Sequence, residues 1–161
     1  MARFAVFFTL VVVAALANTT PVNDSSRLLG RWDLESTENF EQYMVALGVD
    51  EMTRKVGLSI TKQTNVISRD GDLWTISMES PVKSTQMNFT LGVEFDEVRL
   101  DGKLCKSVVK SEGPNKLVQE QSDASTGTLV STIVREVNDK DEMVVTLTAG
   151  TVTSTRVYKR V

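Results

Sequence analysis

Two arginines and a tyrosine near the C-terminal end are the residues whose types and spacing most suggest a binding site. Alternate residues of an extended strand share a face, which places Arg156 with Tyr158, and Arg135 with Ile133 and Val137. An arginine supplies a permanently charged fork of hydrogen-bond donors, and a tyrosine supplies one more. Parity does not tell which face lies inside, and arginines lie in solvent more often than in a core, so both placements remain open at this point.

Two residue types that often perform catalysis are absent or nearly absent from this sequence. It contains no histidine and a single cysteine, Cys105, which removes the commonest general base and any Ser-His or Cys-His nucleophile pair. A zinc site is not expected from such a set. The acidic pair Asp139 and Asp141 falls in a predicted turn, where a solvated loop is a simpler interpretation than an active site. We therefore expect no enzyme, no catalytic residue, no metal and no cofactor.

Length and charge narrow the class of protein further. The 161 residues are enough for one domain with a substantial core. A formal net charge of −3 at pH 7 gives no general electrostatic reason to bind nucleic acid. We expect a monomeric globular domain with no nucleic-acid partner.

The first residues have the pattern of a secretory signal peptide. A positive charge at Arg3 precedes the apolar run Phe4 to Leu16, and Ala15-Leu16-Ala17 has the small-x-small form of a cleavage site. A transmembrane anchor is the alternative, but the run is shorter than the roughly 20 apolar residues needed to span a bilayer. We therefore expect a signal peptide over 1–17, a flexible leader over 18–27 with Pro21, a domain over 28–161, and secretion.

Secretion bears on two further features. Asn-x-Ser/Thr triplets begin at Asn18, Asn23 and Asn88, and each is a possible glycosylation site whose use the sequence does not decide. Cys105 has no partner within the chain, so we expect a buried small hydrophobe, with an intermolecular bond as the alternative.

The rest of the chain divides into a short helical zone and a long series of strands. Phe40, Tyr43, Met44 and Leu47 lie at helical spacing over 39–47, Gly48 is a plausible stop, and 50–59 forms a second helix with Asp50 as its cap. After residue 61, runs rich in β-branched residues alternate with turns at 70–71, 100–102, 112–115, 138–141 and 149–150. Counting the run from Gly30 gives about ten strands joined by short links. The fold class is therefore all-β, an antiparallel up-and-down meander whose closure into a barrel removes its edges and leaves an interior for side chains or one ligand.

Several ordered motifs resemble those of the fatty-acid-binding proteins, members of the intracellular lipid-binding family in the calycin superfamily. The matching stretches are Gly30-x-Trp32-x-Leu34, Asn39-Phe40-Glu41-x-Tyr43-Met44, the run 91–97 (Leu-Gly-Val-Glu-Phe-Asp-Glu), Val134-Arg135-Glu136 and Thr155-Arg156-x-Tyr158. The resemblance covers residues 28–161. It implies a ten-stranded barrel capped by a short helix-turn-helix lid.

The resemblance also implies a binding site and reverses the expectation that the arginines lie in solvent. In the family, residues at the positions of Arg135, Arg156 and Tyr158 reach inside and hold a fatty-acid carboxylate. A buried carboxylate is costly unless it is paired, so this set of donors is chemically suited to the task. Seven further positions resemble residues that line the cavity or its portal, namely Phe40, Tyr43, Met44, Thr53, Val82, Val145 and Leu147. For Phe40 and Met44, ordinary packing of the helix on the barrel is an equal alternative.

The sequence also departs from the family pattern. Family members are normally cytosolic, whereas this chain has the signal pattern. Val82 replaces a portal phenylalanine, and the run 121–132 is longer than the common pattern and lacks its tryptophan, so we expect an extended hairpin there. We expect non-covalent binding and extracellular transport of long-chain fatty acids or similar apolar carboxylates, with a transient membrane contact as a possible step. A secreted, heat-soluble protective barrel with no specific ligand is the alternative.

Overall fold

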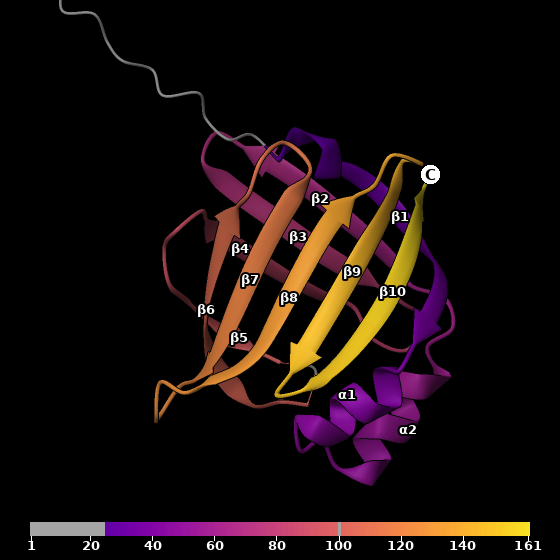
Figure 1. Ribbon diagram of the computed structural model, residues 1–161, viewed down its shortest axis with the longest axis vertical. Coiled ribbons are helices and arrows are strands. Elements are labelled where there is room, and N and C mark those ends of the chain that lie inside the picture. Colours follow the sequence, from indigo (N-terminus) through magenta and orange to yellow (C-terminus); the bar gives the residue numbers. More distant parts are fainter. Residues whose placement is uncertain (1–24, 100) are drawn as a thin grey trace, which may run out of the picture.

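The computed structural model describes residues 25–99 and 101–161, which form a barrel of ten antiparallel strands (Figure 1). The predicted signal peptide and residues 18–24 of the predicted leader lie outside the described residues. In chain order the strands are β1 (Gly30–Glu38), β2 (Thr64–Asp70), β3 (Leu73–Glu79), β4 (Thr85–Thr90), β5 (Phe95–Val98), β6 (Leu104–Ser111), β7 (Lys116–Asp123), β8 (Leu129–Val137), β9 (Glu142–Ala149) and β10 (Val152–Arg160). Their order in the sheet is β4-β3-β2-β1-β10-β9-β8-β7-β6-β5, so the predicted meander is confirmed.

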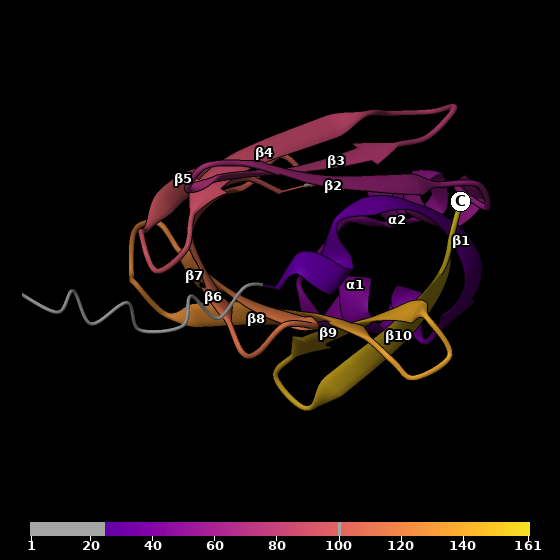
Figure 2. The same ribbon diagram turned by 90° about the horizontal axis from the view of Figure 1, so that it is seen from above.

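The pairing of β1 with β10 brings the first and last strands together, and the sheet ends at β4 and β5. Figure 2 shows β2 to β4 along one wall of the barrel and β7 to β10 along the opposite wall. Between the two end strands, side chains replace the backbone ladder: the rings of Phe89 in β4 and Phe95 in β5 stack with centroids 5.7 Å apart. Aromatic packing of this kind covers the edges and keeps the barrel nearly closed.

The hairpin between β7 and β8 has the extended form expected from the sequence. Residues 124–128 link the two strands, and the register shifts between Gln121 and Ser122. The carboxylate oxygen Oδ1 of Asp123 accepts hydrogen bonds from the backbone N–H groups of Ser125 and Thr126, at 2.9 Å each, and from both hydroxyls. These bonds lower the pKa of Asp123 from its ordinary value of 3.8 to about 2.

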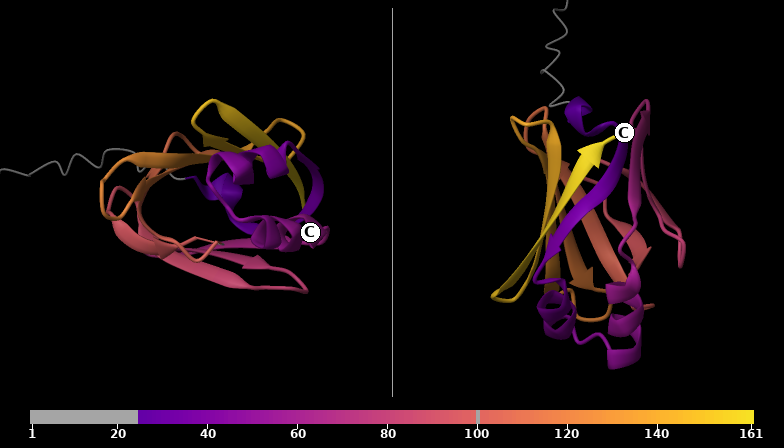
Figure 3. Two further views of the ribbon diagram at one scale, coloured as in Figure 1. Left: turned by 90° about the horizontal axis from the view of Figure 1, so that it is seen from below. Right: turned by 90° about the vertical axis from the view of Figure 1, so that its right-hand side faces the viewer.

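Two short helices, α1 (Phe40–Ala46) and α2 (Glu51–Ser59), cover one end of the barrel and confirm the predicted helix-turn-helix (Figure 3). We call this pair the lid. Gly48 ends α1 with a φ of 70°, a left-handed conformation that glycine adopts without strain. Asp50 caps α2 as predicted, because its Oδ1 accepts from the N–H of Thr53 at 3.0 Å. Tyr43 and Met44 of α1 pack with Ala149 at the end of β9, which holds the lid on the barrel.

The opposite end of the barrel is closed by the chain that leads into β1. The turn η1 (Ser26–Leu28) places Leu28 in a fully buried position, and Trp32 donates from its indole Nε1 to the carbonyl of Leu28 at 2.8 Å. The hydroxyl of Ser25 donates to the carbonyls of Gly113 and Lys116. Ser25 to Arg27 therefore belong with the barrel, although the sequence placed them in a flexible leader.

The sequence left open which face of each strand lies inside the barrel. The structure places both arginines in the interior. Arg135 is buried together with Ile133 and Val137, and Arg156 is buried together with Tyr158. A continuous core fills part of the barrel interior; it includes Leu28, Trp32, Ile67, Trp74, Ile76, Phe89, Val109, Leu117, Val137 and Met143. Within residues 25–99 and 101–161, no helix has the length and apolar character needed to cross a membrane.

Candidate ligand-binding site

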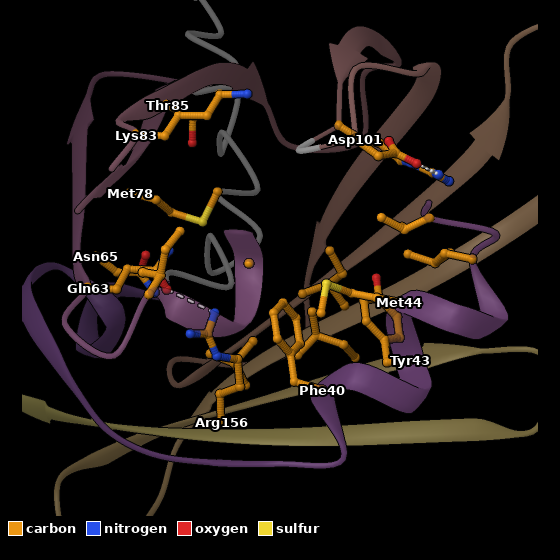
Figure 4. A pocket seen from close by; sticks show the side chains of 18 of the residues that line it. Phe40, Tyr43, Met44, Gln63, Asn65, Met78, Lys83, Thr85, Asp101 and Arg156 are labelled. Atoms are coloured by element: carbon orange, nitrogen blue, oxygen red, sulfur yellow. Dashed lines mark hydrogen bonds and ion pairs between the residues drawn. The ribbon is translucent and has the colours of Figure 1, made fainter. Parts of the chain in front are cut away.

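A cavity lies between the lid and the strands, with a largely apolar wall and a few polar groups (Figure 4). The lid supplies Phe40, Tyr43, Met44 and Thr53, and the strands β8 to β10 supply Ile133, Arg135, Val145, Leu147, Arg156 and Tyr158. All the residues assigned from the sequence to the head-group site line this cavity. Of the predicted cavity and portal residues, only Val82 is missing from its wall.

Val82 departs from the prediction because it lies in the short connection between β3 and β4, where its side chain is 54% exposed. The next residue, Lys83, lines the cavity instead. The replacement of an aromatic residue by valine therefore leaves an exposed side chain at this position, outside the cavity.

The polar end of the cavity is built around Arg156 and Tyr158 on β10. Nη1 of Arg156 and the hydroxyl of Tyr158 both donate to the same atom, Oε1 of Gln63, at 2.9 Å each. Arg156 also donates from Nε to the hydroxyl of Thr37 at 3.3 Å. Its guanidinium carbon lies 4.7 Å from the centroid of the Phe40 ring, so the lid helix α1 contacts the cation directly.

Arg156 is a buried cation whose hydrogen-bond partners are all neutral. No carboxylate pairs with it among residues 25–99 and 101–161. Burial lowers its pKa, because a charge is poorly solvated in the interior, but a guanidinium keeps its proton in proteins. Burial also raises the pKa of Tyr158, so its hydroxyl stays protonated and remains a donor at neutral pH. An anion at this end would gain two strong donors and neutralise an uncompensated charge.

Arg135 has a different electrostatic environment. Its Nη1 donates to Oε1 of Gln119 at 2.9 Å, and Nε2 of Gln119 donates to the carboxylate of Glu97 at 2.7 Å. Gln121 and Ser107 donate to the same carboxylate oxygen, at 3.1 and 2.5 Å. Glu97 opposes the effect of burial on the pKa of Arg135. The positive charge of Arg135 is thus balanced within the wall, which leaves Arg156 as the natural site for a monoanion.

Further polar groups line the cavity away from Arg156 (Figure 4). Arg99 and Asp101 form an ion pair with side chains only 9% and 4% exposed. The pairing raises the pKa of the Arg99 guanidinium. Tyr43 shares a 2.7 Å hydrogen bond with Ser131 on β8, which ties the lid to the wall. Because Arg99 is already paired, it offers less attraction to an anion than Arg156 does.

The sequence analysis did not identify five polar residues that line the cavity or hydrogen-bond to its arginines: Gln63, Asn65, Glu97, Gln119 and Gln121. Gln119 and Gln121 have a signal in the sequence, since they share strand parity with Leu117, an aliphatic residue of the core. Gln63 has no such signal, because it precedes the first residue of β2. Asn65 is 4% exposed and its Oδ1 accepts no hydrogen bond from the described residues.

Comparison with known proteins agrees with this architecture. Residues 29–161 match the model of the Lipocalin / cytosolic fatty-acid binding protein family. The chain belongs to this family. It is 40% identical over 129 residues to the muscle fatty-acid-binding protein of Schistocerca gregaria, covering 80% of this chain and 92% of that one. It is 43% identical over 135 residues to the 14 kDa fatty-acid-binding protein of Schistosoma mansoni, covering 84% and 98%.

Solved structures of relatives share the fold as well. The Schistosoma mansoni fatty-acid-binding protein in complex with arachidonic acid superposes with a TM-score of 0.79 at 40% identity, over 86% of this chain and 98% of that one. A structure described as the REP1-NXSQ fatty acid transporter gives a TM-score of 0.74 at 40% identity, over 83% and 96%. Family and relatives are lipid-binding carriers, which confirms the expectation that the chain is not an enzyme.

Proposed function

We propose that this protein binds long-chain fatty acids, or similar carboxylate-headed lipids, inside the barrel with the carboxylate at Arg156 and Tyr158. The observation that carries the proposal is a buried guanidinium, at one end of a mainly apolar cavity, whose partners among the described residues are all neutral. A cation in such a place is costly to the empty protein, and an anionic ligand removes that cost. A protective barrel with no ligand has no use for this charge.

The apolar part of the ligand supplies most of the affinity. A tail of about 16 carbons buried at ~0.8 kcal/mol per methylene gives ~13 kcal/mol before the costs of ordering and association. The head-group site then fixes the orientation of the lipid. Support from relatives is direct, because the Schistosoma mansoni protein was solved with arachidonic acid.

We further propose that transport takes place outside the cell, since residues 1–17 carry the pattern of a secretory signal. A transient contact with a membrane would deliver lipid to the cavity. The exposed apolar residues of the lid support this step: Met52 is 73% exposed, Val45 54% and Val56 45%. The protein is proposed to act as a monomer.

The test combines identification of the native lipid with a titration. The protein is purified from the medium of secreting cells, extracted with organic solvent and analysed by mass spectrometry, and the delipidated protein is then titrated with palmitate by calorimetry. We expect a fatty acid in the extract and saturable binding at one site. Extracts without lipid, together with no heat of binding, would contradict the proposal.

A further inference from the structure

Gln63 occupies the place where a ligand oxygen is expected. Its amide Oε1 receives hydrogen bonds from Arg156 Nη1 and Tyr158 hydroxyl, both at 2.9 Å, so the two donors of the head-group site converge on one oxygen of the chain itself. The side chain is 8% exposed and lines the cavity (Figure 4). Gln63 Oε1 therefore accepts the two hydrogen bonds that an oxygen of the ligand carboxylate is expected to accept.

We propose that Gln63 is an internal occupant of the head-group site, which a ligand carboxylate must displace, and that it thereby selects ionised over neutral lipids. The inference rests on the proposed function, because it concerns the same site. In the empty protein the amide oxygen satisfies Arg156 and Tyr158. In the loaded protein the carboxylate takes both donors.

The selectivity follows from the strengths of the competing acceptors. The Gln63 amide offers Arg156 a hydrogen bond but no opposite charge, whereas a carboxylate adds the direct attraction between opposite charges, which is strong in a poorly solvated interior. An ionised fatty acid therefore gains free energy when it replaces the Gln63 amide at Arg156. An ester or an alcohol presents a neutral oxygen, which is no better than the amide already in place, so these lipids gain nothing from the exchange.

The backbone around Gln63 allows its side chain to move without disturbing the sheet. The carbonyl of Gln63 accepts from the N–H of Leu34 at 2.8 Å, which anchors the main chain, whereas in the described part of the chain the side chain is held through Oε1 alone. Asn65 lies two residues further on and also lines the cavity, and its buried Oδ1 has no donor among the described residues. In the loaded protein we expect the displaced Gln63 amide to donate to that acceptor.

The amide of Gln119, which contacts the other arginine, is not a displaceable occupant of the same kind. It accepts from Arg135 in the same way, but its Nε2 donates to Glu97 at 2.7 Å. This amide is therefore held at both ends. Displacing it would also break a hydrogen bond to a charged carboxylate, which is among the stronger kinds.

The test uses Gln63→Leu and Gln63→Glu in the full secreted chain, with Gln86→Leu on the exposed face of β4 as the matched control. Delipidated proteins are titrated with palmitate and with methyl palmitate at neutral pH. Gln63→Leu removes the competing oxygen and should bind palmitate about tenfold more tightly. Gln63→Glu places a permanent anion beside Arg156 and should bind palmitate about a hundredfold more weakly, with little change for the ester. The control should match the wild type.

Equal or weaker binding of palmitate by Gln63→Leu would overturn the inference, since a residue that assists the ligand behaves in that way. The melting temperature of the empty protein provides a readout that needs no lipid: Gln63→Leu should lower it and Gln63→Glu should raise it. Unchanged melting temperatures would also overturn the inference. A wild type that binds no palmitate contradicts the proposed function. If the wild type binds no palmitate but Gln63→Leu does, the role of Gln63 as an occupant is supported. If neither protein binds palmitate, the inference about Gln63 is contradicted as well.

Discussion

Replacement of Arg156 by leucine separates an internal head-group site from simple burial of a lipid tail. Arg156 is 7% exposed, and its described partners are the neutral oxygens of Gln63 and Thr37. Arg156→Leu keeps an apolar side chain in the wall and removes the charge, its donors and the contact of the cation with the Phe40 ring. Gln63 retains the Tyr158 hydroxyl as a donor, so the empty barrel should remain folded and at least as stable, because a costly buried cation has gone.

The expected loss of affinity follows from the burial of the ion pair that the ligand carboxylate would form with Arg156. Truncating one partner of a buried, hydrogen-bonded charge pair costs roughly 2–5 kcal/mol. Since 1.4 kcal/mol corresponds to a factor of ten, the affinity for palmitate should fall by about 30-fold to several thousand-fold. Methyl palmitate has no charge to pair, so it should bind the wild type more weakly than palmitate and should be nearly indifferent to the substitution.

Calorimetric titration of both ligands into both proteins measures these four affinities. Arg31→Leu is the control, because Arg31 lies exposed on β1 with Glu79 as its partner, and its loss removes the same charge from the outer face of the barrel. The control should bind palmitate as the wild type does. Equal affinities for all combinations of ligand and protein would refute the internal site.

Three further predictions concern the lid, the β7–β8 hairpin and export. Replacing residues 39–60 by a flexible linker should leave a folded barrel that exchanges palmitate faster in stopped-flow assays; unchanged rates would count against entry beneath the lid. Because the pKa of Asp123 is lowered to about 2, its stabilising effect is present above pH 3.8 and lost as the pH falls toward 2. The free energy of unfolding in urea should therefore be higher for the wild type than for Asp123→Asn at neutral pH, and this difference should shrink as the pH falls across that range. A difference that stays constant with pH would refute a stabilising role of the ionised carboxylate. Intact-mass analysis of secreted protein should give an N-terminus at Asn18, and retention of residues 1–17 would contradict export by cleavage.

The topology could be predicted from the sequence because each turn has a local chemical signature. The predicted turn at Asp70-Gly71 lies one residue later, at Gly71-Asp72 between β2 and β3, and Gly71 has a φ of 57°, a left-handed value that glycine accepts at little cost. The lid could be predicted equally well, because the apolar spacing of α1 and the cap at Asp50 both depend on residues close in the chain. Local rules of this kind decide which strands are neighbours in a meander.

The orientation of the arginines could not be obtained from local rules. Parity groups Arg156 with Tyr158, but whether that face lies inside depends on groups from distant parts of the chain. Gln63 is one such group, far from Arg156 in sequence and adjacent to it in the barrel. Only resemblance to a family with an internal carboxylate site pointed to the correct face.

The acidic partner of Arg135 could not be found for a related reason. Glu97 lies on β5, and its donors Ser107, Gln119 and Gln121 come from β6 and β7. A charged residue in a short strand is typical of a solvent-facing position. Its half-buried position against three donors depends on the register of two neighbouring strands, which the sequence pattern does not specify.

A crystal structure of the delipidated protein recombined with palmitate tests the central claim most directly. We predict that the carboxylate oxygens lie within hydrogen-bond distance of the Arg156 guanidinium and the Tyr158 hydroxyl, with the tail in the apolar part of the cavity. A carboxylate bound beside Lys83 or Arg99, with the tail toward Arg156, would contradict the claim.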